Sequence, residues 1–272
     1  MKASSTLSIY TAFIHNAFLK MLAYRLRYYT GILTYLLFVS VYYFIWQTIY
    51  ADKPPGSSIN GFTLPEMITY LAVGWMARSF YFTNVDYDID HLVRSGEITS
   101  IMIRPINFQA MMFSQAIGEA IFRASFFSLP ISICLSLVFP VQAPVSFQAG
   151  LLFGLSTLLG FFVLTALNFL VGLSAFFLES IDGLCRAKYG LVQLASGLLL
   201  PLAFFPDWLR PTLDALPFKA ICYVPLQVYL GKLSSTELIW QLELQVCWAF
   251  GLMLAGHLMW LKARAHLSLQ GG

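Results

Sequence analysis

The chain has 272 residues, of which 58% are hydrophobic and only 11% are charged. A soluble domain carries about 25% charged residues, so this composition excludes a soluble globular protein and predicts one embedded in a bilayer. The formal net charge of +3 is too small and too dispersed for nucleic-acid binding. The cysteines show neither CxxC nor Cys/His spacing, so we interpret them as packing residues and expect no metal site or disulfide framework: Cys134, Cys185, Cys222 and Cys247.

The first segment, residues 1–29, is expected to form an amphipathic helix suited to the membrane surface. Its apolar residues recur at steps of three and four, while His15, Asn16 and Lys20 fall elsewhere on the helix. The apolar positions are Leu7, Tyr10, Ile14, Phe18 and Met21. Two interpretations stay open for this segment: a simple interfacial anchor, or a helix that also contacts a partner.

Long uncharged runs predict six membrane-spanning helices, because about 20 apolar residues cross the hydrocarbon as a helix. Residues 124–178 contain no Asp, Glu, Lys or Arg, which is enough for two spans, and the prolines of "FPVQAPVSF" (139–147) divide them. The fold class is therefore an all-α integral membrane protein, with residues 1–272 as a single transmembrane domain. The predicted spans are 31–50, 64–83, 112–138, 148–177, 189–206 and 244–261.

Lysine and arginine near the span ends predict the orientation, because cytoplasmic loops are enriched in both. The alternate loops are poorer in these residues: 51–62 holds only Lys53, and 139–147 holds no charge. Both termini are therefore expected to be cytoplasmic. The residues that carry this argument are Lys2, Lys20, Arg25, Arg27, Arg94, Arg104, Arg186, Lys188, Lys262 and Arg264.

The loop of residues 86–107 lies on the predicted cytoplasmic side. Ile89, Leu92 and Val93 share one helical face, and the charged residues Asp88, Asp90, Arg94 and Glu97 point elsewhere. Gly96 permits a turn, and Arg104-Pro105 ends the element before the third span. Such a helix either lies on the membrane or presents an apolar ridge to the groove of a soluble protein.

Near the start of the third span, Glu119 and Arg123 are spaced by four residues. This spacing places both side chains on one helix face, where they are expected to pair and stabilise the fold.

The segment 201–232 holds five of the 12 prolines, which excludes a continuous span because proline removes a backbone donor. It is nevertheless rich in apolar and aromatic residues. A re-entrant external hairpin over 207–232 reconciles the two properties, and an external loop resting on the headgroups is the alternative. The residues singled out for the hairpin are Pro206, Trp208, Pro217, Phe218 and Pro225.

Three motifs in this order resemble the permease subunits of type-two ABC exporters, within them the daunorubicin- or viologen-type group. They are Gly96 followed by "IRP" (103–105), "LLLPLAFFPDWLRPTLDALPF" (198–218), and the ending "LSLQGG" (267–272). The resemblance implies an amphipathic N-terminal helix, a coupling helix in 86–107 and a re-entrant hairpin before the last span. It makes these residues the expected interface with an ATPase: Asp88, Leu92, Val93, Arg94, Gly96, Glu97, Arg104 and Pro105.

The chain has no GxxxxGK[ST] phosphate loop, so ATP and Mg²⁺ are expected in a separate ATP-binding subunit and no cofactor is expected here. A second permease subunit, either a copy of this chain or a paired homologue, is expected to complete the pathway. The resemblance implies the bacterial cytoplasmic (inner) membrane and export of an amphiphilic or membrane-associated substrate.

Two other classes remain open. A secondary carrier would carry ionisable or broken-helix sites near the midplane, often repeated, and few acidic groups lie within the predicted spans. A membrane enzyme needs a nucleophile-base or metal constellation, yet the histidines are scattered and form no HExxH motif: His15, His91, His257 and His266. We therefore predict a transport subunit without catalytic residues.

Overall fold

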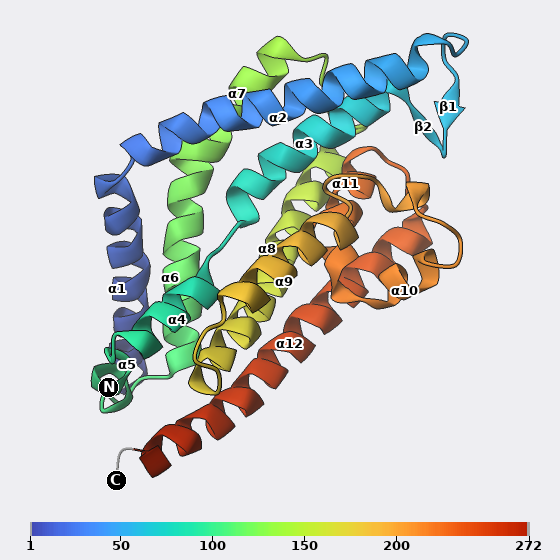
Figure 1. Ribbon diagram of the computed structural model, residues 1–272. Helices are drawn as coiled ribbons and strands as arrows, with labels where there is room; N and C mark the ends of the chain where they lie inside the picture. The colour runs from blue at the N-terminus through green and yellow to red at the C-terminus, as the bar shows by residue number, and fades with distance from the viewer. Residues whose placement is uncertain (1, 271–272) are drawn as a thin grey trace.

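The computed structural model describes residues 2–270 and is mostly helical (Figure 1), as the all-α prediction requires. The α-helices are α1 (Lys2–Ala23), α2 (Leu26–Ala51), α3 (Leu64–Tyr81), α4 (Val85–Arg94), α5 (Ile98–Met102), α6 (Phe108–Arg123), α7 (Leu129–Val138), α8 (Phe147–Leu173), α9 (Asp182–Ala195), α10 (Arg210–Ala215), α11 (Tyr223–Tyr229) and α12 (Ser235–Gln270). Shorter elements are the π-helix η1 (Ala124–Ser128), the 3-10 helices η2 (Ser174–Phe176), η3 (Leu202–Phe204) and η4 (Pro217–Ala220), and the paired strands β1 (Ser58–Ile59) and β2 (Phe62–Thr63).

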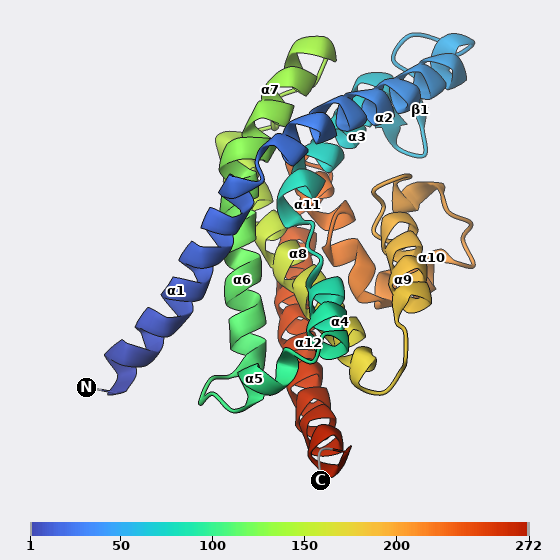
Figure 2. The same cartoon turned by 60° about the vertical axis from the view of Figure 1, so that its left-hand side comes forward.

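Helix α1 lies alongside α6 and meets α2 at a sharp bend, which we call the elbow (Figures 1 and 2). The bend comes after Ala23, so the first helix ends earlier than the predicted residue 29. Glycine at position 118 allows the close approach, because a Cβ there would lie 2.1 Å from the carbonyl oxygen of Ile14. Phe18 also packs edge-on against Phe122, with ring centroids 6.0 Å apart. The apolar face of α1 is therefore covered in part by α6.

Four helices in the described chain are long and apolar enough to cross a membrane. They agree with four of the six predicted spans, namely 31–50, 112–138, 148–177 and 244–261. Their bounds are Tyr29–Ala51, Phe108–Val138, Phe147–Phe176 and Ser235–Ala265.

The other two predicted spans differ from these four. Helix α3 covers most of 64–83 and runs beside α2, and it buries most of its residues, including Arg78. The prediction of a continuous helix over 189–206 is wrong, because α9 ends at Ala195. Gly197 follows with φ of +81°, a left-handed conformation that commonly ends helices. The periodic apolar sequence continues beyond this point, but the helix does not.

The helix over 108–138 is continuous but contains one wide turn. The π-helix η1 separates α6 from α7, and Pro130 stands at the start of α7. Proline removes a backbone hydrogen bond, which is one of the recognised causes of an irregular turn within a helix. Helix α6 packs mainly on α1, whereas α7 packs on α2 and α3.

The molecule has two distinct ends. The start of α1, the helices α4 and α5, and the end of α12 lie at one of them, which we call the α4–α5 end (Figures 1 and 2). The β1–β2 hairpin and the α7–α8 connection lie at the other. The start of α1, the α4–α5 loop and the end of α12 thus lie on the same side of the molecule.

Candidate functional site

The loop between α3 and α6 folds as two short helices. Helix α4 has Asp86 and Asp88 in its first turn and His91 and Arg94 in its last, an order that complements the helix dipole. The chain then turns at Gly96, whose φ of +75° favours glycine. The predicted turn at Gly96 is therefore confirmed, and the segment 88–102 forms α4 and α5 rather than one helix.

The predicted interface residues divide into an inner and an outer group. Ile89 is fully buried, and Leu92 and Val93 are half-buried against the core. These side chains pack in part on the chain's own helices, and their contact with an ATPase stays a prediction. Asp88 is half-buried and lines a cavity. The outer group is exposed: Arg94, Gly96, Glu97, Arg104 and Pro105.

One apolar side chain of this loop is more exposed than the others. Ile103, beside Arg104 and Pro105, is 85% exposed. Its position before Arg-Pro at the end of α5 was the sequence signal that could have identified it. A substitution at Leu92 would disturb internal packing as well as any docking, so Ile103 is the better residue for testing a partner interface.

Helix α4 is fixed to the body of the protein by buried polar contacts. The carboxylate of Asp86 accepts a hydrogen bond from Lys188 Nζ at 2.6 Å, and this carboxylate is 1% exposed. Lys188 also donates to Asn168 Oδ1 at 2.7 Å, and Asn168 Nδ2 donates to Thr83 Oγ1 at 2.8 Å. Charge-assisted bonds of this kind are stronger than neutral ones. They join α4, α8 and α9 into what we call the buried network.

A second set of contacts lies nearer the surface. Arg94 Nε donates to Asp90 Oδ1 at 3.0 Å, and Arg94 Nη2 donates to Ser180 Oγ at 2.9 Å. Arg94 therefore joins the tip of α4 to the loop that precedes α9.

The sequence pattern used Lys188 only to predict the orientation in the membrane. It did not predict that Asp86 and Asn168 would contact this lysine. Asn168 carries a detectable signal, because it is a polar residue within the uncharged run 124–178. Polar groups inside a membrane segment need internal partners. The identity of those partners depends on contacts 85 and 102 residues apart in the sequence.

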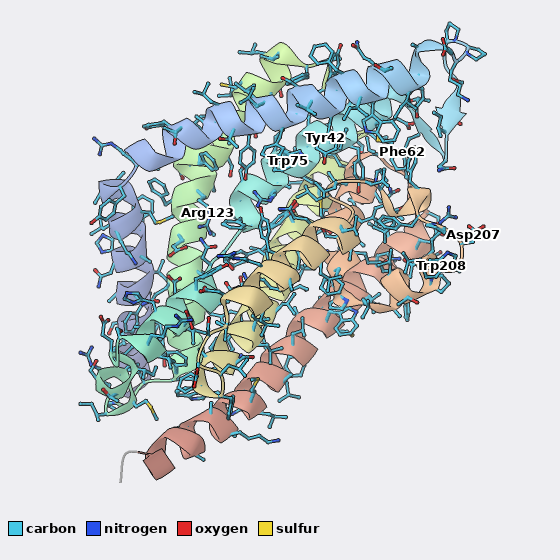
Figure 3. The ribbon with its side chains drawn as sticks, in the orientation of Figure 1. Tyr42, Phe62, Trp75, Arg123, Asp207 and Trp208 are labelled. Carbon is cyan, nitrogen blue, oxygen red and sulfur yellow. The ribbon has the colours of Figure 1, made fainter. Side chains whose placement is uncertain are left out.

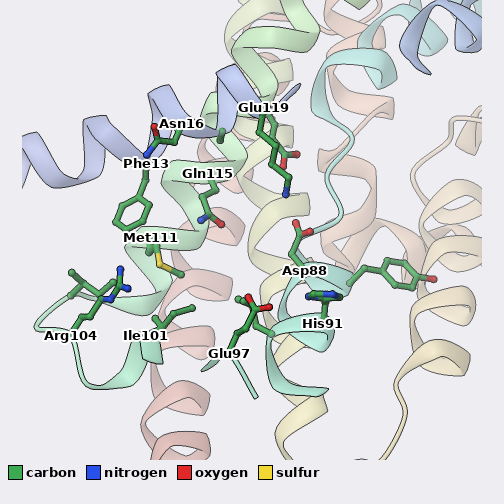
Figure 4. Close-up of a pocket in the computed structure, with 15 residues that line it drawn as sticks. Phe13, Asn16, Asp88, His91, Glu97, Ile101, Arg104, Met111, Gln115 and Glu119 are labelled. Atoms are coloured by element: carbon green, nitrogen blue, oxygen red, sulfur yellow. The ribbon is translucent and has the colours of Figure 1, made fainter. Parts of the chain in front are cut away.

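A cavity of about 720 Å³ opens between α1, α4, α5 and α6. Phe13 and Asn16 line it from α1, and Asp88 and His91 line it from α4 (Figure 4). Burial and the neighbouring Glu119 carboxylate raise the pKa of Asp88 to about 6, against the opposing effects of Lys20 and His91.

Stability is expected to depend on the protonation of Asp88. Its carboxyl holds a proton up to about pH 6 in the folded chain, whereas an unfolded aspartate ionises near about pH 4. The folded state therefore binds more protons between these values, and its stability falls as the pH rises through this window. We expect Asp88→Asn to flatten this decline and to raise the melting temperature at pH 7.

Thermal unfolding in detergent at pH 4.5, 5.5 and 7 measures the effect. Asp52→Asn is the matched control, because Asp52 is exposed and directly follows α2, whose end lies away from α4–α5. An Asp88→Asn variant whose melting temperature changes with pH as much as that of the wild type would contradict the assignment.

The proline-rich segment before α12 folds as α10, η4 and α11, without a continuous helix. Of the residues singled out there, Pro217, Phe218 and Pro225 are buried, whereas Pro206 and Trp208 are exposed (Figure 3). Two features hold the buried part, which we call the inner hairpin (217–228).

Helix α12 contributes the first of these features. Gln245 Nε2 donates to the carbonyl oxygen of Ala220 at 2.6 Å, and Gln245 Oε1 accepts from Ser156 Oγ at 2.9 Å. Helix α8 contributes the second, because a Cβ at Gly160 would lie 2.8 Å from the Ile221 carbonyl oxygen. The backbone at Ala220 and Ile221 is thus covered by α8 and α12.

The predicted pairing of Glu119 and Arg123 is confirmed, with Arg123 Nη1 donating to Glu119 Oε2 at 3.2 Å. Among the described residues, no group of three or more His, Cys, Asp and Glu side chains is placed to hold a metal ion.

A family model described as "ABC-2 family transporter protein" matches residues 36–271. The chain therefore belongs to the ABC-2 transporter family and is a membrane-spanning permease subunit of an ABC transporter. Subunits of this family carry out transport rather than catalysis, and they generally pair with an ATP-binding subunit. No curated protein and no solved structure matches the chain.

Proposed function

We propose that this permease serves an ATP-driven exporter and that the α4–α5 end is where it couples to a separate ATPase. The buried network is the observation that carries the proposal. An exposed tip on α4–α5 would contact the ATPase, and Asp86, Lys188 and Asn168 would pass its displacement to α8 and α9. A strong, shielded ion pair suits this role, because it keeps α4 and the bundle moving as one body.

In this proposal the chain spans the bacterial cytoplasmic membrane six times, with both termini in the cytoplasm. Helix α3 would be a further span, since its 18 residues extend about 27 Å, close to the hydrocarbon thickness. Helix α9 and the following residues up to 206 would form the remaining one. The inner hairpin would re-enter the membrane from the outside, and its burial against α8 and α12 supports this arrangement.

The proposed assembly contains two permeases and two ATPase subunits. The second permease is either a copy of this chain or a homologue, and ATP and Mg²⁺ would bind to the ATPase subunits. The proposed substrate is amphiphilic or membrane-associated, and the many exposed apolar side chains of the described helices support this choice.

Ile103→Asp tests the coupling surface. We expect the variant to insert and to keep its melting temperature, because Ile103 is 85% exposed, but to lose most of its affinity for the ATPase. Truncation of a central interface contact weakens binding by about 2 kcal/mol or more. The measurements are copurification with the co-expressed ATPase and the ATP hydrolysis of the complex.

Trp208→Asp is the matched control, because Trp208 is also a large exposed apolar residue (77%) but lies on the proline-rich segment away from α4–α5. An Ile103→Asp permease that retains its ATPase and its transport rate would refute coupling at this surface. Equal losses in both variants would point to a general folding defect and would also count against it.

A further inference from the structure

A second cavity adjoins the first and lies between the elbow, α3 and η1. Its volume is about 410 Å³. It shares Lys20, Asp88 and Glu119 with the 720 Å³ cavity, so the two adjoin. Both volumes lie within the usual range for small-molecule sites. We call the joined space the elbow cleft.

The inner wall of the elbow cleft carries two buried arginines. Arg78 is 9% exposed and is fixed by two phenols, with Nη1 donating to Tyr35 and Nη2 donating to Tyr189. Arg123 is 4% exposed (Figure 3). Its Nη1 donates to Glu119 and its Nε to the Phe80 carbonyl oxygen, but Nη2 has no hydrogen-bond partner among the described residues.

An incompletely bonded guanidinium at this depth is unusual, because buried charges are normally paired and fully hydrogen-bonded. Arg123 lines the elbow cleft, so a small shift of its side chain would bring this enclosed N–H group to an anionic group bound there. Its planar donor geometry matches phosphate.

The arginines and the carboxylates line different parts of the elbow cleft. The arginines lie on the inner wall, beside Tyr35 and Phe127 of the candidate spans. The carboxylates of Asp88 and Glu119 lie where the two cavities adjoin, toward the α4–α5 end, with the exposed Lys20 beside them, and Figure 4 shows both carboxylates on the wall of the first cavity. A ligand that fits this arrangement has apolar chains innermost, then an anionic group, then a cationic group.

We propose that the elbow cleft binds the headgroup of an aminophospholipid from the adjacent leaflet. The phosphate lies against Arg123 and Lys20, and the primary ammonium lies between Asp88 and Glu119. A primary ammonium donates hydrogen bonds to these carboxylates, whereas a quaternary ammonium has no N–H group. An anionic lipid without an amine would leave both carboxylates facing negative charge. That this leaflet is the cytoplasmic one rests on the proposed function, but the binding chemistry does not.

Native mass spectrometry of the purified permease tests the proposal. It would be offered phosphatidylethanolamine, phosphatidylcholine or phosphatidylglycerol with identical acyl chains. We expect the wild type to retain phosphatidylethanolamine at least about tenfold better than the other two, because hydrogen bonds to charged groups contribute most of the selectivity. Asp88→Asn should remove the preference over phosphatidylcholine, and Lys20→Gln should weaken retention of all three lipids.

Lys53→Gln is the control, since Lys53 is an exposed lysine two residues after the end of α2, which lies away from α4–α5. This variant should bind the lipids as the wild type does. Lys20 is itself exposed, so its replacement tests the phosphate contact without removing a buried ion pair. Equal retention of the three lipids by the wild type, or an unchanged preference in Asp88→Asn, would overturn the proposal.

Free phosphoethanolamine distinguishes a lipid from a soluble ligand. We expect it to compete only weakly, and displacement of the lipid at equal concentration would overturn the assignment to a membrane lipid. These measurements need no ATPase, so their outcome is independent of the Ile103→Asp experiment.

Discussion

Replacing Lys188 by methionine is expected to lower the free energy of unfolding by about 3–5 kcal/mol, the usual effect of removing one partner of a buried ion pair. The substitution leaves the Asp86 carboxylate, 1% exposed, without its cation. Asn168 loses a donor at the same time. The readout is thermal or denaturant unfolding in detergent.

Lys219→Met is the matched control. Lys219 is also buried, at 7% exposed, and also pairs with an aspartate, but the Asp214 side chain is 55% exposed. Water can therefore solvate Asp214 once its partner is gone, and the expected loss is much smaller. The double variant Asp86→Asn/Lys188→Met should recover part of the stability, because no uncompensated charge remains. Equal losses at Lys188 and Lys219, or a double variant less stable than Lys188→Met, would refute this account.

Replacing Gly118 by alanine is expected to be the second most damaging change. The added Cβ would lie 2.1 Å from the carbonyl oxygen and 2.9 Å from the carbonyl carbon of Ile14. Since the obstacle is backbone rather than a flexible side chain, α1 has to move away from α6. We expect a loss of about 3 kcal/mol, at the upper end of the usual range for overpacking, and faster amide exchange in α1.

A glycine-to-alanine substitution in α8 should instead increase the stability. Gly154 also lies within a helix, but a Cβ there would meet no atom within 4 Å. Gly154→Ala should therefore stabilise the helix by about 1 kcal/mol through propensity alone. Hydrogen exchange and thermal unfolding of both variants check the pair. If Gly118→Ala proved as stable as Gly154→Ala, the close packing of α1 on α6 would be wrong.

The features that could be predicted from the sequence are those set by composition and by local spacing. Apolar run length gave the membrane class and four of the candidate spans. The i to i+4 spacing gave the Glu119–Arg123 pair, and Gly96 gave the turn between α4 and α5. Each of these depends on residues close together in the chain.

The sequence could not show which distant segments pack against one another. Periodicity placed Leu92 and Val93 on an apolar face, but it could not show that the chain's own helices cover that face. It likewise could not show that Lys188 contacts Asp86, because folding brings these residues together from distant segments. The end of α9 at Ala195 depends on a single positive φ at Gly197 within an apolar sequence.

The π-helix η1 also affects how the helix over 108–138 can change over evolutionary time. Its wide turn accommodates one extra residue, which offsets the angular phase of α7 relative to α6 by about 100°, one residue's share of a 3.6-residue turn. Ile131 and Leu135 of α7 accordingly pack in a cluster with residues of α2 and α3, whereas Met111 and Met112 of α6 belong to the main core. Because each half keeps its own phase, substitutions that adapt α6 to α1 leave the packing of α7 on α2 undisturbed.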